Sequence, residues 1–216
     1  MKALKTLFGG FIALTLFAAT AIAAQDSKFE EGKHYTVISE QTTNKPELRE
    51  YFSYYCPACR AYEPYLNEFE KILPKGAKLE KTHVDFMQQT APEIQFMLSK
   101  ALIIAEKTAV AKKFSPAIFN YLQTERATIN SEEDIRNIFV LSGGDGAKFD
   151  KGMKNFSIIS EAKRNKQTQD KLSAARQLTG VPTMVVNGKY LINSKALDDK
   201  NFFADYTALV AHLFTL

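Results

Sequence analysis

The segment Tyr54-Tyr55-Cys56-Pro57-Ala58-Cys59-Arg60 holds both cysteines of this 216-residue chain, with two residues between them. An aromatic-rich run, residues 48–55, leads into the first cysteine and is typical of a buried strand. Pro57 suits the first turn of a helix, where its missing N–H would be unpaired in any case. Apolar side chains then recur every three or four residues up to Leu73, which predicts a helix with one buried face. The cysteine pair is therefore expected at a strand-to-helix junction.

A Cys-x-x-Cys pair can bind zinc, form a structural disulfide, carry redox chemistry or be incidental. Structural zinc takes four ligands, but no second cysteine pair exists and the three histidines are widely scattered, so no metal site is expected. A disulfide that closes so short a loop removes little chain entropy and stabilises weakly. The redox interpretation is favoured because Cys56, at the helix N-terminus, faces the N–H groups of residues 58 and 59, which stabilise a thiolate. Cys59, one turn later, should point to the core and be less accessible.

The N-terminus has the pattern of a secretory signal peptide. Lys2 and Lys5 precede an apolar run, and Ala21-Ile22-Ala23 supplies the small residues that signal peptidase reads. We expect cleavage after Ala23; a membrane anchor is the alternative, but the run is short for a span and no stop-transfer pattern follows. Loss of the two lysines lowers the formal net charge from +4 to +2 (4 − 2). Since no basic stripe is present, nucleic acid is not an expected partner.

The chain after the signal peptide combines strand-containing ends with a helical middle. Strands are expected at 35–38, 48–55 and 79–86. From 87 to 165 only helical patterns occur, with helices expected to begin at Thr90-Ala91-Pro92-Glu93, at Ser115-Pro116 and at Ser131, and a fourth to carry Phe149, Met153 and Phe156. A long polar helix should then end at Gly180.

Strand character returns at Val181. Asn187-Gly188 between two apolar runs predicts a β-hairpin, and a last helix follows over 202–213. The resulting fold is α/β: residues 24–86 and 166–216 form one layered domain, and residues 87–165 are an inserted all-helical domain.

These motifs resemble the DsbA family of periplasmic thiol–disulfide oxidoreductases, which have a thioredoxin fold with an inserted helical domain. The resemblance covers the chain after the signal peptide. It rests on Gln25, Gly32-Lys33, Glu50-Tyr51-Phe52-Ser53, Cys56-Pro57-x-Cys59, Leu73-Pro74, His83-Val84, Phe86-Met87, Asp134-Ile135-Arg136, Gly180-Val181-Pro182 and Val186-Asn187-Gly188-Lys189-Tyr190. It implies that Val181–Pro182 is a cis peptide bond beside the cysteines, so that Val181 can offer its N–H and C=O to an extended substrate. Without the resemblance, Pro182 could equally be an ordinary turn proline.

The resemblance also implies roles for charged residues. Glu50 would lie near Cys59 and accept its proton, a task for which burial would raise its pKa; the alternative is an outward-facing residue, which strand alternation permits. Glu63 and Lys81 would tune the redox pair, together with Pro57, Ala58 and Val181. Ala58 is a departure, because the common family motif has histidine there. A cationic histidine stabilises the thiolate, so Ala58 predicts a less acidic Cys56 and a weaker oxidant.

We therefore expect a thiol–disulfide oxidoreductase in the periplasm of a Gram-negative bacterium, a monomer without a cofactor, that introduces disulfides into exported proteins through Cys56–Cys59. The helical domain would form one wall of an apolar surface around Cys56. The implied partners are reduced, unfolded exported proteins and a DsbB-type, quinone-linked membrane oxidase. The alternatives are a periplasmic disulfide reductase or isomerase that uses the same pair, or a non-enzymatic binder of unfolded chains.

Overall fold

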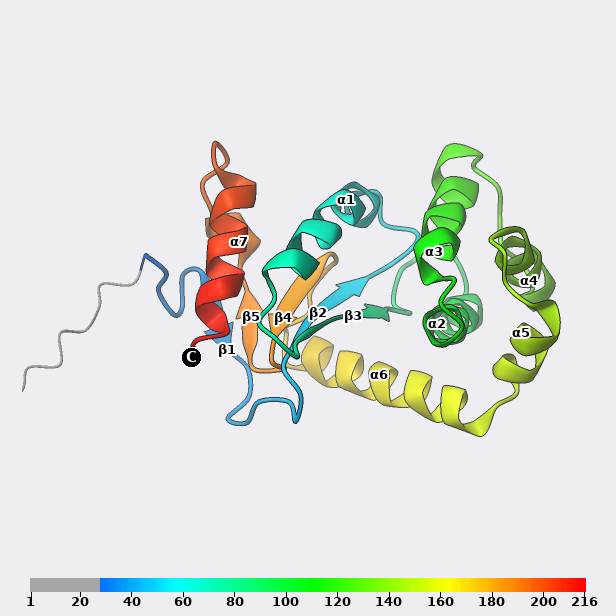
Figure 1. Cartoon of the computed structure of the whole chain (residues 1–216), viewed down its shortest axis with the longest axis horizontal. Coiled ribbons are helices and arrows are strands. Elements are labelled where there is room, and N and C mark those ends of the chain that lie inside the picture. Colours follow the sequence, from blue (N-terminus) through cyan, green and yellow to red (C-terminus); the bar gives the residue numbers. More distant parts are fainter. Residues whose placement is uncertain (1–27) are drawn as a thin grey trace, which may run out of the picture.

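The computed structural model describes residues 28–216, so the predicted signal peptide lies outside the described residues. A five-stranded sheet with its covering helices forms one part, and a group of helices forms the other (Figure 1). Among the described residues, no helix is both long enough and apolar enough to cross a membrane.

The sheet has the order β1-β5-β4-β2-β3. Its strands are β1 (Tyr35–Val37), β2 (Glu47–Phe52), β3 (Lys78–His83), β4 (Thr183–Val186) and β5 (Tyr190–Ile192). Strands β2 and β3 are parallel, and the other pairs are antiparallel. The predicted hairpin is present: Asn187 and Gly188 both have positive φ, 52° and 64°, as a type I′ turn requires.

Two predicted strands end earlier than expected. Strand β2 stops at Phe52 because the next residues form a turn, in which the Cys56 N–H donates to the Ser53 carbonyl at 3.0 Å. Strand β3 stops at His83, and the Asp85 N–H donates to the side chain of Gln169 rather than to a neighbouring strand. In both cases the apolar run of the sequence continues beyond the end of the strand. The hydrophobic pattern alone therefore predicts strands that are too long.

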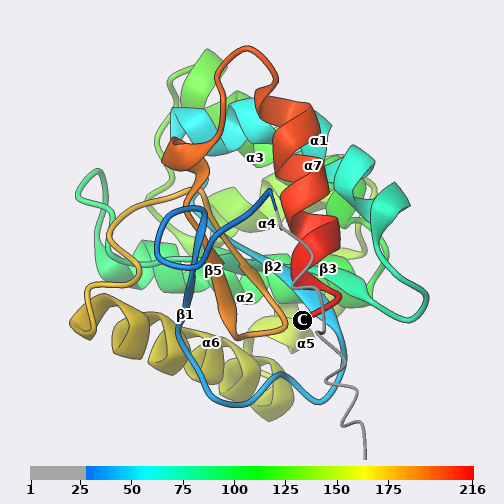
Figure 2. The ribbon, with the colours of Figure 1, turned by 90° about the vertical axis from the view of Figure 1, so that its left-hand side faces the viewer.

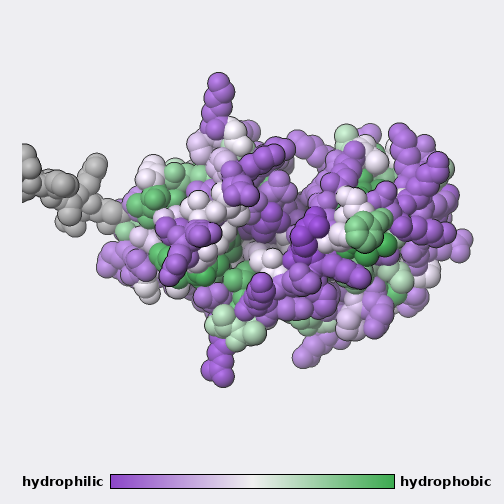
Figure 3. Space-filling model, turned by 90° about the horizontal axis from the view of Figure 1, so that it is seen from below, coloured by the Kyte–Doolittle hydropathy of each residue, from purple (hydrophilic) through white to green (hydrophobic). Residues whose placement is uncertain are grey.

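Helices cover both faces of the sheet. Helices α1 (Pro57–Ile72) and α7 (Phe202–Leu213) lie on one face, and α6 (Phe156–Ala174) lies on the other (Figure 1, Figure 2). Leu48 of β2 belongs to the core under α1 and α7, whereas Tyr51 belongs to the core under α6. This alternation puts Leu48, Glu50 and Phe52 on the same face as α1. Seen from the α6 side, the surface is predominantly hydrophilic (Figure 3).

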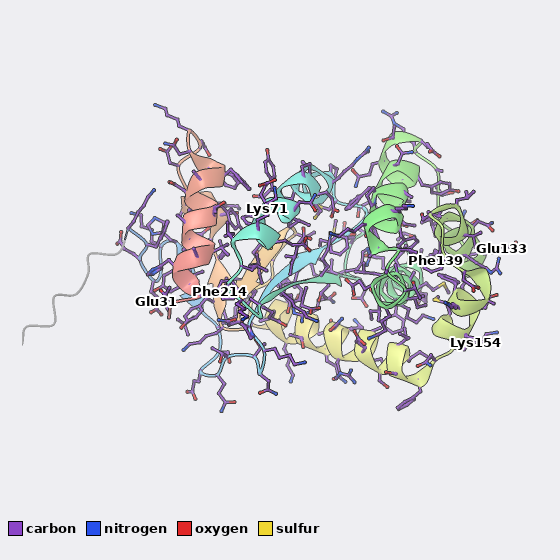
Figure 4. The ribbon with its side chains drawn as sticks, in the orientation of Figure 1. Glu31, Lys71, Glu133, Phe139, Lys154 and Phe214 are labelled. Atoms are coloured by element: carbon purple, nitrogen blue, oxygen red, sulfur yellow. The ribbon has the colours of Figure 1, made fainter. Side chains whose placement is uncertain are left out.

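The inserted block contains α2 (Pro92–Lys107), α3 (Ala111–Phe119), a π-helical turn (Asn120–Thr124), α4 (Glu132–Leu141), α5 (Gly146–Met153) and the first turns of α6. Phe139 points into the middle of this block (Figure 4), where its ring packs on Phe114 and Phe149. The block therefore has a core of its own. Helix α6 runs without a break across residue 165, so the predicted domain boundary falls inside a helix.

Four helix ends differ from the prediction. Ala91, not Thr90, is the N-cap of α2 and makes no side-chain cap, so Pro92 alone marks the start. Helix α3 begins at Ala111 after an N-cap, Val110, that also has no capping side chain, and Pro116 lies inside it. Phe156 belongs to α6 because Asn155 caps that helix. Helix α6 ends at Ala174, followed by Arg176 at a φ of 57°. The start at Ser131 is confirmed as a capping box with Asp134.

Candidate active site

The cysteine pair lies where β2 turns into α1, as predicted. Cys56 is the N-cap of α1 (φ −98°, ψ 112°), and its sulfur accepts a hydrogen bond from the Cys59 N–H at 3.1 Å. An N-cap side chain normally uses oxygen to satisfy one of the free N–H groups of the first turn. Here a sulfur takes that place, so the helix N-terminus stabilises negative charge on Cys56.

The two thiols differ in acidity. The pKa of Cys56 is lowered to about 7 by the Cys59 side chain and by the N–H groups of Cys59 and Ala58, against the opposing effect of burial. Burial and the hydrogen bond to Cys56 raise the pKa of Cys59 far above its usual range. Cys59 is completely buried and Cys56 is 5 % exposed. The pair therefore carries its charge on Cys56, and Ala58 contributes through its backbone although its side chain cannot.

The loop before β4, which contains Val181 and Pro182, lies against the cysteine pair. Val181–Pro182 is a cis peptide bond, which confirms the expectation from the family resemblance. The Cys56 thiol donates to the Val181 carbonyl across 3.4 Å. Residues 125 positions apart in the sequence thus meet at the reactive sulfur.

Glu50 lies completely buried beneath the pair, so the outward-facing alternative is wrong. It sits opposite Lys81 in the β2–β3 register, and the Lys81 ammonium is 3.2 Å from a Glu50 carboxyl oxygen. Burial raises the pKa of Glu50 to about 7, although the positive charge of Lys81 opposes this. The negative charge of Glu50 contributes to the raised pKa of Cys59. A carboxyl with this pKa can hold or release a proton near neutral pH.

Lys81 links Glu50 to Glu63 of α1, with which its ammonium also forms an ion pair. Burial alone would lower the pKa of Lys81, but Glu50 and Glu63 raise it, so it stays charged. Apart from this ion pair, neither carboxyl oxygen of Glu50 has a hydrogen-bond partner among the described residues. Unsatisfied buried polar groups are rare in proteins and occur at redox and catalytic sites.

A cavity of about 640 Å³ between α1, β3, α2 and α3 reaches this charged group. Glu63 and Lys81 line it, together with Glu106 of α2. The surrounding protein, and then the carboxylates of Glu80 and Glu161, raise the pKa of Glu106 to about 7. No sequence motif marks Glu106, because its position in an amphipathic helix is typical of an ordinary solvent-facing residue.

His83 has no place in this chemistry. It is buried, this burial lowers its pKa to about 3, and its ring stacks on that of Tyr54 with 5.0 Å between the ring centroids. It therefore stays neutral and serves the packing. Among residues 28–216, no group of three or more histidine, cysteine, aspartate or glutamate side chains is arranged to hold a metal ion.

Residues 47–205 match the family model of the DSBA-like thioredoxin domain. The chain belongs to this DsbA-like family. The predicted resemblance and the thioredoxin fold are confirmed, and the chain is a thiol–disulfide oxidoreductase of this family.

Curated relatives and solved structures cover nearly the whole chain. The thiol:disulfide interchange protein DsbA of Pectobacterium carotovorum is 32% identical over 218 residues, 98% of this chain and 99% of that protein. DsbA of Dickeya dadantii is 33% identical over 199 residues, 89% and 92% of the two chains. The structure of a Proteus mirabilis DsbA variant with the non-covalently bound peptide PWATCDS superposes with a TM-score of 0.76 at 28% identity, covering 88% of this chain and all of that one. Klebsiella pneumoniae DsbA gives 0.72 at 27% identity, covering 86% and 99%.

In this DsbA-like chain the predicted site residues come from both strand-containing ends. Strand β2 supplies Glu50, helix α1 supplies Pro57, Ala58, Cys59 and Glu63 next to its N-cap Cys56, β3 supplies Lys81, and the loop before β4 supplies Val181 and Pro182. One further contact comes from the inserted block: Gln123 binds the turn that holds Cys56. No motif marks Gln123, because only the folded chain brings it to residues that lie more than sixty positions earlier.

Proposed function

We propose that this protein is a periplasmic dithiol oxidase, which passes the disulfide of Cys56–Cys59 to exported proteins that still carry reduced cysteines. The observation that supports this most strongly is the contrast between the two thiols, with an acidic Cys56 at the helix N-terminus and a buried, weakly acidic Cys59. A stabilised thiolate is a good leaving group, so a disulfide that releases Cys56 as thiolate is readily reduced and acts as an oxidant.

The proposed exchange has two steps. A substrate thiolate attacks the Cys56 sulfur, the Cys56–Cys59 bond breaks, and its electron pair goes to Cys59, which takes up a proton. A second substrate thiolate then attacks the substrate sulfur of the mixed disulfide and Cys56 departs as a thiolate. The substrate loses two electrons and gains a disulfide, and the enzyme pair gains the two electrons. Protonated Glu50 supplies the proton for Cys59, and ionised Glu50 takes it back when the enzyme is re-oxidised.

The other site residues have supporting roles in this proposal. Val181, next to the cis-Pro182, binds the backbone of an extended substrate beside Cys56, which agrees with the Val181 carbonyl facing that sulfur. Lys81 and Glu63 hold Glu50 near its working pKa. Pro57 and Ala58, both exposed, border the sulfur and tune it. The peptide bound to Proteus mirabilis DsbA is consistent with a polypeptide substrate.

The proposal includes the cellular location of the protein and the partner that re-oxidises it. The N-terminal signal directs the protein to the periplasm, where it works as a monomer. A DsbB-type, quinone-linked membrane oxidase accepts its electrons and restores the disulfide.

One experiment tests the function: the oxidised protein is mixed with a reduced, unfolded protein, and free thiols and refolding are followed over time. We expect stoichiometric loss of substrate thiols, and no reaction with Cys56→Ser. The reduction potential of the pair, measured on the same sample, separates the alternatives. Failure to oxidise the substrate together with a strongly reducing potential would identify a reductase or isomerase. Full activity of Cys56→Ser in preventing aggregation would identify a binder.

A further inference from the structure

Gln123, a side chain of the inserted block, forms hydrogen bonds with the turn that contains Cys56. The Gln123 side-chain amide nitrogen donates to the carbonyl oxygen of Tyr54 at 2.8 Å and to that of Cys56 at 3.2 Å. Carbonyl oxygens only accept hydrogen bonds, so the NH₂ group, with its two donors, must be the end of the amide that faces them. One side chain thus binds the backbone on both sides of residue 55.

Gln123 lies in an unusual piece of backbone. Residues Asn120–Thr124 form the π-helical turn that continues α3, and the Glu125 N–H donates to the Asn120 carbonyl at 3.0 Å. Turns of this kind are rare and are often found at functional sites, because the extra residue re-aims the side chains around it. Here the π-helical turn carries Gln123, whose side-chain amide reaches the redox turn.

The backbone of Cys56 is held from both sides by this arrangement. Its N–H donates to the Ser53 carbonyl at 3.0 Å, and its own carbonyl accepts from Gln123 and from the Arg60 N–H at 3.2 Å. These bonds fix the N-cap conformation that points the Cys56 sulfur at the Cys59 N–H. Gln123 therefore acts on the sulfur through the backbone, without touching it.

A second contact ties the same turn to the inserted block. Tyr54 is completely buried, and its hydroxyl lies 2.9 Å from the hydroxyl of Ser115 in α3. Tyr54 is thus anchored by its side chain through Ser115 and by its carbonyl through Gln123. The inserted block thus holds the redox turn through two separate contacts.

We propose that Gln123 is a positioning residue for disulfide exchange, which fixes the Tyr54–Cys56 turn and stabilises the reduced enzyme more than the oxidised one. In the oxidised enzyme, the Cys56–Cys59 bond itself closes the turn. In the reduced enzyme only hydrogen bonds hold Cys56 on the helix N-terminus, so the contribution of Gln123 is larger. Stabilising the reduced form makes the pair a stronger oxidant. The inference rests on the proposed function for its biological use, but its physical claim concerns the pair alone.

The test compares Gln123→Met with Gln167→Met. Methionine has a similar size but no N–H donor, and Gln167 is an exposed glutamine of α6 far from the cysteines in sequence. For each protein, the oxidised fraction is measured at equilibrium with glutathione, and the pKa of Cys56 is measured from the ultraviolet absorbance of its thiolate. For Gln123→Met we expect the pKa of Cys56 to rise and the equilibrium constant to shift about fivefold toward the oxidised form, if the two hydrogen bonds of Gln123 stabilise the reduced form more than the oxidised form by about the net contribution of one hydrogen bond. Gln167→Met should match the wild type.

The free energy of unfolding distinguishes positioning from a general structural role. It is measured for the oxidised and the reduced form of each protein. A general structural role would lower both by the same amount and leave the glutathione equilibrium unchanged, and this result would overturn the proposal. The proposal requires the reduced form to lose more.

Gln123→Glu covers the case in which the methionine variant does not fold. An ionised carboxylate repels the two carbonyl oxygens, whereas a protonated carboxyl has one O–H to donate. We therefore expect a shifted glutathione equilibrium at neutral pH that returns toward the wild-type value as the pH falls; a shift without this pH dependence would overturn the proposal. Because the equilibrium needs no protein substrate, a clear Gln123 effect in a protein that fails to oxidise substrates would refute the oxidase function alone.

Discussion

Glu50 and Lys81 face each other across the parallel strands β2 and β3, and the Lys81 ammonium lies 3.2 Å from the carboxyl of Glu50, which is completely buried. This ion pair does not compensate Glu50 fully, because burial still raises its pKa to about 7. A buried ion pair that is poorly solvated and incompletely hydrogen-bonded destabilises the fold relative to neutral groups of the same shape. The position of Glu50 is therefore better explained by chemistry than by stability.

Glu50→Gln should stabilise the protein at alkaline pH. The folded-state pKa of Glu50 is about 7, above its ordinary value of 4.5. Between these two values the unfolded chain loses the proton and the folded chain keeps it, so the stability of the wild type falls as pH rises, and the loss is complete above pH 7. We expect Glu50→Gln to exceed the wild type by about 3 kcal/mol in free energy of unfolding at pH 8, and to match it near pH 4.

The measurement is urea unfolding of the reduced proteins at the two pH values, with Glu40→Gln as control, since Glu40 is exposed. The same variant should form the mixed disulfide with substrate more slowly, and the rate should lose its pH dependence near 7, because the group that gives a proton to Cys59 is gone. A stability gain that is equal at both pH values would contradict the assignment of the raised pKa to Glu50.

Ala58→His should make the protein a stronger oxidant. The N–H of Ala58 already contributes to the lowered pKa of Cys56, and a cationic imidazole at this exposed position would add a positive charge beside the sulfur. We expect the pKa of Cys56 to fall by about one unit and the glutathione equilibrium to shift about tenfold toward the reduced protein. Ala147→His, on the exposed surface of α5, is the control. An unchanged equilibrium would mean that the weaker oxidant predicted from Ala58 is wrong.

Local signals in the sequence were enough to predict the redox junction. Pro57, the stripe on α1 and the Asn187-Gly188 turn each specify nearby backbone, and each lies where predicted. Ser131 is a similar case, because its capping box with Asp134 is a local arrangement. Starts without a capping side chain, such as those at Ala111 and Pro92, depend on tertiary packing and were misplaced.

The residues of the site could be predicted where a sequence motif or the family resemblance marked them. Glu50 was identified through the family resemblance, because its strand also carries Glu47 and Arg49 and strand alternation permitted it to face outward. Gln123 and Glu106 had no such signal, because both occupy helix positions that suit any polar residue. The contact of Gln123 with the redox turn, and the place of Glu106 in the cavity lining, exist only in the folded chain. The cis peptide at Pro182 required the family resemblance, because an isolated proline before a strand is compatible with either isomer.

The hydrogen bond between Tyr54 and Ser115 should stabilise the junction of the two parts. Both side chains are buried and their oxygens are 2.9 Å apart. Tyr54→Phe leaves the Ser115 hydroxyl without this partner, and we expect a loss of about 2 kcal/mol in free energy of unfolding. In the double variant with Ser115→Ala, both polar groups are gone, so the combined loss should be smaller than the sum of the two single losses. Additive losses in urea unfolding would show that the two hydroxyls do not interact.

The stability of the reduced protein should rise between pH 7 and pH 9 because of Cys56. Its folded-state pKa of about 7 lies below the ordinary value of 9.0. The folded chain therefore releases the proton first, so the contribution is complete above pH 9 and is lost as the pH falls through 7. The pKa of Cys59 is shifted in the opposite direction, and the resulting loss of stability begins only above the ordinary thiol pKa.

Relative to Cys56→Ser, the reduced wild type should thus gain about 2 kcal/mol in free energy of unfolding between pH 6 and pH 9. Oxidised wild type, which has no thiols to titrate, is the control and should show no such gain; a parallel rise in both forms would assign the effect to another group.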